Sequence, residues 1–263
     1  MMGRGVGKRS IGSWIRFVWL NAWFWTVAPL VSVTFISLAA IYVGVFLVLL
    51  RNRRKTQWLI RRSMGVYGRL MIICAWPLVR VKYVDYAPQE TPPFLFICNH
   101  RSSSDAYLTA YVGCECIQVL NIWPAHVPLM GQLARLAGFL RVREMPFEEF
   151  VAAGSRLLQQ GCSIIAFPEG TRSGSVALGS FHGSSFRLAQ LNRVKIVPFV
   201  ISGNENIPRR GSAWLNPGTV AVSKLPAVTP EMYEGMTPYK LKTLVRDMIA
   251  RHLDGQTGQS HVE

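Results

Sequence analysis

Apolar positions along the chain form two contrasting patterns, and the first is a long uninterrupted run near the N-terminus. Phe17 to Leu50 contains no charged side chain over 34 residues. As one straight helix it would reach about 50 Å, whereas the hydrocarbon core of a bilayer is about 30 Å thick. Because proline interrupts helices, we expect a break at Pro29, with an interfacial segment over 13–26 and a deeper membrane segment over 30–50.

Tryptophan and basic residues support a membrane assignment for this region. Four of the eight tryptophans precede Pro29, and tryptophan concentrates at the membrane–water interface. Basic clusters flank the apolar run, and residues 56–79 mix apolar with basic positions, as in a helix on a membrane surface. Two topologies stay open: a re-entrant hairpin bent at Pro29, and a single span over 30–50 with the N-terminus outside. A signal peptide fits poorly, because basic residues follow the run where a cleavage site would lie.

The second pattern begins near residue 81, where short apolar runs alternate with amphipathic stretches. The runs typical of strands are 81–86, 94–98, 163–167, 195–201 and 219–223. The stretches typical of helices are 103–112, 147–160, 184–192 and 238–253. This alternation predicts an α/β fold with a mostly parallel sheet flanked by helices. We therefore divide the chain into N-terminal membrane-anchoring helices over 1–79, an α/β domain over 80–253 and a flexible polar tail over 254–263.

Most of the formal net charge of +15 comes from the N-terminal region, which also contains the long apolar run. The first 84 residues contain 13 lysines and arginines and no acidic residue, whereas the remainder holds 16 basic against 14 acidic residues. Basic residues beside apolar sequence are typical of contact with anionic lipid headgroups. Nucleic acid is not expected as a partner, because the sequence has no zinc-finger, RNP or basic-zipper pattern.

The five cysteines are odd in number and form no disulfide framework, which favours a reducing compartment. Cys114 and Cys116 lack a second pair of ligands, so no metal site is expected there. Small, partly buried side chains are the simpler interpretation.

A polar motif directly follows the predicted strand 94–98: Asn99-His100-Arg101-Ser102-Ser103-Ser104-Asp105. Open α/β sheets place their sites at the carboxyl ends of strands. A histidine can take a proton from an alcohol, and a carboxylate on its other ring nitrogen fixes the required tautomer. Passing from a loop into a first helical turn could bring Asp105 back to His100. The alternative is structural, with Ser102 as a helix N-cap, Asp105 completing a near capping box, and His100 as an ordinary loop residue.

A second polar motif, Phe167-Pro168-Glu169-Gly170-Thr171-Arg172-Ser173, also follows a predicted strand. Its glycine allows a turn that points backbone N–H groups at an anion, and Arg172 offers a planar donor fork that matches phosphate oxygens. A surface turn with a solvated arginine would explain this motif on its own. Two such loops together, one with a base and one with an anion clamp, favour a catalytic interpretation.

In these motifs the chain resembles the glycerophospholipid acyltransferase family, whose best-known members are the 1-acylglycerol-3-phosphate acyltransferases. Residues 167–173 match the family pattern Phe-Pro-Glu-Gly-Thr-Arg-Ser throughout, and 197–199 match a later Val-Pro-hydrophobic element. The residues that match the pattern Asn-His-x-Ser-x-x-Asp are Asn99, His100, Ser102 and Asp105. The resemblance covers residues 75–225.

The resemblance implies transfer of a fatty acyl group from a thioester to a free hydroxyl of a lysophospholipid, with 1-acylglycerol-3-phosphate giving phosphatidic acid as the first expectation. The donor would be acyl-CoA or acyl-carrier-protein, with no metal and no bound cofactor. The catalytic residues would be His100 and Asp105; the substrate-binding residues would be Arg143, Glu169, Gly170, Thr171 and Arg172. The basic flanks predict a membrane protein with its catalytic domain on the cytoplasmic face, which is the inner membrane in a bacterium.

The sequence departs from the family pattern where the acceptor headgroup would bind. In the second motif, over 138–143, Arg143 aligns with the motif arginine, but the glycine is displaced and Arg141 interrupts the hydrophobic run. His126 and His182 are interpreted as packing or surface residues. Another lysolipid acceptor therefore stays open, and so does a non-catalytic membrane-surface lipid-binding protein. A covalent acyl-serine enzyme is disfavoured, because none of the motif serines lies in a Gly-x-Ser-x-Gly elbow.

Overall fold

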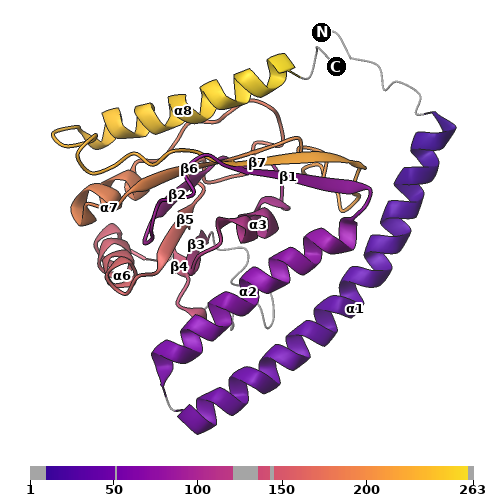
Figure 1. Ribbon diagram of the computed structural model, residues 1–263, viewed down its shortest axis with the longest axis horizontal. Coiled ribbons are helices and arrows are strands. Elements are labelled where there is room, and N and C mark those ends of the chain that lie inside the picture. The colour runs from indigo at the N-terminus through magenta and orange to yellow at the C-terminus, as the bar shows by residue number, and fades with distance from the viewer. Residues whose placement is uncertain (1–9, 51, 121–135, 143–144, 260–263) are drawn as a thin grey trace.

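The computed structural model describes residues 10–50, 52–120, 136–142 and 145–259 (Figure 1). Its centre is a seven-stranded sheet with the order β1-β7-β6-β2-β5-β3-β4. Neighbouring strands run parallel except β6 and β7, which pair antiparallel. The strands are β1 (Val79–Asp85), β2 (Leu95–Cys98), β3 (Cys116–Leu120), β4 (Leu140–Arg141), β5 (Ser163–Ala166), β6 (Ile196–Ser202) and β7 (Gly218–Lys224). The predicted α/β fold with a mostly parallel sheet is confirmed.

Helices cover both faces of the sheet (Figure 1). They are α1 (Ile11–Leu50), α2 (Arg53–Ala75), α3 (Asp105–Leu108), the 3-10 helix η1 (Thr109–Val112), α6 (Phe147–Gln159), α7 (Ser184–Asn192) and α8 (Pro238–Gln259). Alternate side chains of β2 serve the two faces: Leu95 and Ile97 join the cluster with α6, α7 and α8, whereas Phe96 joins the cluster with α1, α2 and α3. Because both faces are covered, β2 and β5 are buried along their whole length, and each reads as a continuous apolar run.

The N-terminal region forms two long antiparallel helices, α1 and α2 (Figure 1). The predicted break at Pro29 is wrong, since α1 continues through this residue. Proline removes one helix hydrogen bond, and packing opposes that loss, because Ala28 is buried in a cluster with Met71 and Cys74 of α2. The chain therefore does not bend back at Pro29, and the helical hairpin lies between α1 and α2 instead.

α1 is attached to the sheet domain near its beginning. The buried Asn21 side chain bonds both backbone groups of Leu215: its amide donates to the carbonyl at 2.8 Å, and its oxygen accepts from the N–H at 2.8 Å. The Trp25 indole donates to the Ala213 carbonyl at 3.2 Å. From Leu30 onward α1 exposes many apolar side chains. By length and composition α1 can cross a membrane, since an 18-residue window within it has a mean hydropathy of 2.1.

Besides α1, the elements β3, β4 and α8 differ from the sequence prediction. β3 and β4 are additional strands; β4 has two residues, which is too short to give a pattern. α8 continues to Gln259 and so includes residues 254–259, which the sequence analysis assigned to the tail. Gln256 explains the extension, because its side-chain oxygen accepts a hydrogen bond of 2.6 Å from the Ser202 hydroxyl at the end of β6. Residues 260–263 lie outside the described part of the chain.

Candidate active site

Three polar loops meet at one edge of the sheet, because each follows the carboxyl end of a neighbouring parallel strand. His100 follows β2, Glu169 follows β5 and Asn204 follows β6, with β2 lying between the other two strands. Asn99 ties β2 to β6: its amide donates to the Ile201 carbonyl at 2.7 Å, and its oxygen accepts from the Ile201 N–H at 2.8 Å. The two motifs expected to act together therefore do lie together.

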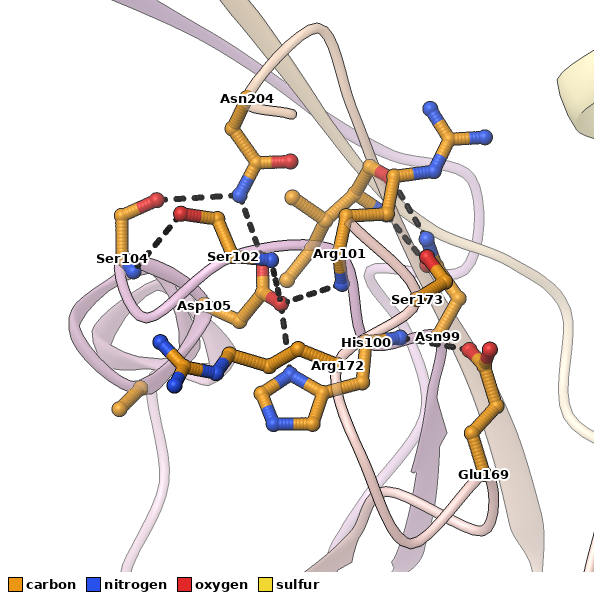
Figure 2. Close-up of polar contacts among 12 residues, drawn as sticks. Asn99, His100, Arg101, Ser102, Ser104, Asp105, Glu169, Arg172, Ser173 and Asn204 are labelled. Atoms are coloured by element: carbon orange, nitrogen blue, oxygen red, sulfur yellow. Dashed lines mark hydrogen bonds and ion pairs between the residues drawn. The ribbon is translucent and has the colours of Figure 1, made fainter. Parts of the chain in front are cut away.

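His100 and Asp105 form a close pair (Figure 2). Nδ1 of His100 lies 2.7 Å from Oδ2 of Asp105, whose side chain is fully buried. The same oxygen accepts the backbone N–H groups of Arg101 at 2.7 Å and Ser102 at 2.9 Å. The His100 ring lies against the Phe167 ring, with centroids 4.5 Å apart, and its side chain is 21% exposed. The imidazole is thus held on one side by a buried carboxylate and remains partly open to solvent.

The structural alternative for this motif is only partly realised. Asp105 accepts the Ser102 N–H, as a capping-box residue would. The Ser102 hydroxyl also accepts the Ser104 N–H, at 3.4 Å, as an N-cap would. However, the same hydroxyl lies 3.0 Å from the Ile207 carbonyl and 2.8 Å from the Pro208 carbonyl, and the N-cap of α3 is Ser104. Capping therefore does not account for the contact between Asp105 and His100.

Glu169 braces the second loop against the first. Its Oε1 accepts the His100 backbone N–H at 2.7 Å, and its Oε2 accepts the Gly179 backbone N–H at 2.9 Å. Burial raises the pKa of the Glu169 carboxyl, and the two hydrogen bonds to its charged form oppose that rise. Both carboxylate oxygens are engaged by the backbone, and the substrate-binding role of Glu169 stays a prediction.

Arg172 lies beside the His100 loop (Figure 2), because the N–H of the next residue, Ser173, donates to the His100 carbonyl at 2.8 Å. Within the described residues the Arg172 guanidinium makes no hydrogen bond or ion pair. Gly170 has a φ of +71°, which favours glycine, and both Gly170 and Thr171 are exposed. The Gly170 N–H donates to the Phe167 carbonyl at 3.0 Å, and the substrate-binding roles of Gly170, Thr171 and Arg172 stay predictions. Arg143, the second predicted arginine, lies outside the described residues.

Sequence reasoning missed two buried residues of the site. The Asn204 amide donates to Oδ1 of Asp105 at 2.5 Å and to the Ser104 hydroxyl at 3.0 Å. Arg101 forms an ion pair with Glu205 and donates to the Val176 carbonyl at 2.8 Å. The sequence does contain a signal for Asn204, because the segment 203–206 is a third polar loop after a predicted strand.

The cysteines and the other two histidines singled out in the sequence are the remaining candidates. In the part of the chain that the structure describes, no group of three or more His, Cys, Asp or Glu side chains could hold a metal ion. Cys114 and Cys116 are partly buried, as their simpler interpretation expected, and Cys74, Cys98 and Cys162 are buried. His182 is exposed next to Gly170, and His126 lies outside the described ranges.

The similarity to known proteins lies in the part of the chain that contains these residues. The segment 79–202, which runs from β1 through β6 and carries all three loops, matches the family model described as Acyltransferase. This segment, just under half of the chain, carries the similarity to the acyltransferase family. The resemblance deduced from the motifs is therefore confirmed.

The chain is also similar to curated proteins named 1-acyl-sn-glycerol-3-phosphate acyltransferase. The chloroplastic LPAT1 of Arabidopsis thaliana is 28% identical over 211 residues, which cover 77% of this chain and 57% of that protein. The protein of Cocos nucifera is 30% identical over 177 residues, covering 64% and 56%. The alpha protein of Mus musculus is 27% identical over 169 residues, covering 61% and 57%. This chain thus spans less than two thirds of the length of these relatives.

Among solved structures, this chain is similar to PlsC, the 1-acyl-sn-glycerophosphate (LPA) acyltransferase of Thermotoga maritima. The TM-score is 0.74 at 20% identity, over 93% of this chain and 98% of that one. At this identity the similarity concerns the fold. Because it covers nearly the whole chain, it includes most of the N-terminal helix pair as well as the sheet domain.

Proposed function

We propose that this chain is an O-acyltransferase that moves a fatty acyl group from an acyl thioester to the free hydroxyl of a lysophospholipid. The observation that carries the proposal is the 2.7 Å contact between His100 Nδ1 and the buried Asp105 carboxylate. This contact fixes the tautomer in which Nε2 is the free base. The names of the relatives favour 1-acylglycerol-3-phosphate as the acceptor and phosphatidic acid as the product.

The histidine serves both proton transfers of the reaction. The acceptor hydroxyl gives its proton to Nε2 of His100 while its oxygen attacks the thioester carbonyl. The tetrahedral intermediate then collapses, the C–S bond breaks, and the imidazolium gives the proton to the leaving thiolate. Asp105 stabilises the imidazolium between these steps. General-base catalysis of this kind contributes about 10² to 10⁴ in rate.

Arginine binds the acceptor phosphate in this proposal. Arg172 belongs to the loop whose next N–H bonds the His100 carbonyl, so a phosphate held there would place the neighbouring hydroxyl beside the base. The Gly170 N–H closes the turn onto the Phe167 carbonyl at 3.0 Å, and exposed Thr171 after it adds a backbone donor to the same anion. Arg143 is the second proposed ligand. The donor is acyl-CoA or acyl-carrier-protein, and the mechanism uses neither a metal nor a bound cofactor.

The membrane supplies the acceptor. The exposed apolar side chains of α1 support contact with lipid, and the basic residues around α1 and α2 support contact with anionic headgroups. Positive residues remain on the cytoplasmic side of membranes. We therefore place the catalytic domain on the cytoplasmic face, which is the inner membrane in a bacterium.

An acyl-transfer assay on the purified full-length protein tests the proposal. Radiolabelled acyl-CoA and acyl-carrier-protein are each offered with a panel of lysophospholipids, and the products are separated by thin-layer chromatography. We expect phosphatidic acid from 1-acylglycerol-3-phosphate with the wild type and none with folded His100→Ala. Absence of turnover by the wild type on every acceptor would favour a lipid-binding protein. Activity confined to acceptors without phosphate would remove the proposed role of the arginines.

A further inference from the structure

We propose that Asn204 is a positioning residue for the reaction, and that it holds the Asp105 carboxylate in the orientation that presents Oδ2 to His100. The inference rests on the proposed acyl transfer. Asn204 is fully buried, so its side chain is placed to act through Asp105 and not through contact with a substrate. It comes from the loop after β6, about a hundred residues away in sequence from the carboxylate that it contacts.

The two oxygens of Asp105 are held by different parts of the chain. Oδ2 receives the backbone N–H groups of Arg101 and Ser102 and faces Nδ1 of His100. Oδ1 accepts a hydrogen bond of 2.5 Å from the Asn204 amide, and within the described residues no other donor bonds this oxygen. The terminal torsion of an aspartate is broad and weakly restricted by its own sterics. Fixing the second oxygen therefore fixes the plane of the carboxylate, and with it the direction of the bond to His100.

The orientation of the Asn204 amide satisfies Asp105 but leaves the Asn204 side-chain oxygen without a hydrogen bond among the described residues. Its nitrogen donates to Asp105 and to the Ser104 hydroxyl at 3.0 Å, so both amide hydrogens are used. Its oxygen is buried and has no partner among the described residues (Figure 2). Buried polar atoms without a partner are rare in folded proteins. The reverse orientation would place the amide oxygen against a carboxylate oxygen, so the contact with Asp105 decides the orientation.

The backbone before Asn204 is built for this placement. Gly203 has a φ of +81°, and a Cβ at this position would collide with the Thr219 carbonyl of β7. Only glycine therefore permits this turn at the end of β6. The end of β6 is itself fixed to β2 by the two hydrogen bonds between Asn99 and Ile201. The loop that delivers Asn204 and the loop that carries His100 are thus held in register.

Steady-state kinetics on two variants test the proposal. Asn204→Ala removes the amide, and Asn204→Leu replaces it with an apolar side chain of similar volume. The matched control is Asn206→Ala, because Asn206 lies in the same loop but is exposed, and its recorded contacts with Asn216 use its backbone oxygen. We expect both Asn204 variants to lower kcat by about 10- to 100-fold, the loss typical of a small misplacement in an active site. The KM values of donor and acceptor should stay at the wild-type values in both variants. Both should remain folded with a lower melting temperature, because the buried Oδ1 of Asp105 loses its donor. All the properties of the control should stay at the wild-type values.

A double-mutant cycle separates positioning from a merely structural role. If Asn204 acts through Asp105, Asn204→Ala should cause no further loss of kcat in an Asp105→Ala background. A full additional loss there would overturn the proposal, and so would wild-type kcat in Asn204→Ala. Loss of the folded state in both Asn204 variants would also overturn it, by assigning the residue to loop stability. If the wild type and the Asn206→Ala control are inactive as well, the proposed function itself fails and this inference with it.

Discussion

At the scale of single residues, the site depends on a carboxylate whose hydrogen bonds come from the backbone and from an amide. Asp105 is fully buried, and its recorded partners are two N–H groups of its own loop, the Asn204 amide and His100. Among the described residues no arginine or lysine side chain neutralises it. Its negative charge is therefore available to an imidazolium at His100.

Asp105→Asn should lower kcat nearly as far as His100→Ala, by roughly 10³- to 10⁴-fold. A neutral amide does not stabilise the imidazolium, and its NH₂ group can face Nδ1 and impose the wrong tautomer. The measurement is kcat at saturating substrates, with the melting temperature as a check on folding. Retention of more than about a tenth of the wild-type kcat would contradict the general-base assignment.

Arg172→Lys should raise the acceptor KM by about tenfold or more, because a point charge does not replace a planar donor fork on a phosphate. The donor KM should change little. Arg156→Lys is a suitable control, since Arg156 is an exposed arginine on α6, outside the three loops. Equal increases in the KM of both substrates would argue against a phosphate-binding role for Arg172.

Glu169→Gln should lower the free energy of unfolding by about 1–3 kcal/mol, because the amide nitrogen must face the N–H of either His100 or Gly179. The effect depends on pH. A raised pKa means that folded Glu169 keeps its proton to higher pH than the unfolded chain does. Its contribution to stability is therefore complete below the unfolded pKa and is lost as pH rises through the folded one. The gap in melting temperature between wild type and variant should narrow with rising pH, and a gap that widens would refute this account.

At the scale of elements, hydrophobic periodicity predicted most of the long helices and strands. The position of polar loops at the carboxyl ends of strands predicted where the site lies. The strands that carry His100 and Glu169 gave strong signals, because burial on both faces makes them continuous apolar runs. The rule that parallel strands end at one edge then brought their loops together. Long-range contacts were not predictable in this way: Asn204 and Asp105 are joined by tertiary structure alone, and Pro29 remains helical because α2 packs beside it. The two-residue strand β4 has too few residues to show a period.

Asn21 attaches α1 to the loop around Leu215, and this attachment can be tested. Asn21→Leu removes both hydrogen bonds to the backbone of Leu215, and each buried group left without a partner costs about 1–3 kcal/mol. The loop around Leu215 should then detach from α1 and be cleaved faster in limited proteolysis. Thr26→Ala on the same helix is the control, because its hydroxyl bonds only the Ala22 carbonyl and is exposed. Unchanged cleavage in Asn21→Leu would show that the remaining contacts of α1 suffice.

At the scale of the whole molecule, the N-terminal helices are attached to the sheet domain at both ends of the apolar stretch. Asn21 holds the beginning of α1 to Leu215. After the chain reverses, Arg54 at the start of α2 donates to the Gln160 carbonyl at 3.0 Å, and the buried Arg61 pairs with Glu115 at 2.8 Å. A helix attached to one domain at both ends cannot carry its N-terminus across a bilayer while these contacts persist. The apolar side chains beyond Pro29 would then enter the leaflet nearest the domain.

We therefore expect both ends of α1 to lie on the cytoplasmic side, together with the catalytic domain. The single span over 30–50 with an outside N-terminus would require the Asn21 contacts to break, and it would place the basic N-terminal residues on the disfavoured face. Cysteine labelling in intact cells distinguishes the two arrangements. In a cysteine-free background, Ser10→Cys reports on the start of α1, and Glu231→Cys, at an exposed position of the sheet domain, is the reference. Neither should react with an impermeant maleimide until the cells are permeabilised, whereas labelling of Ser10→Cys alone in intact cells would establish the single span.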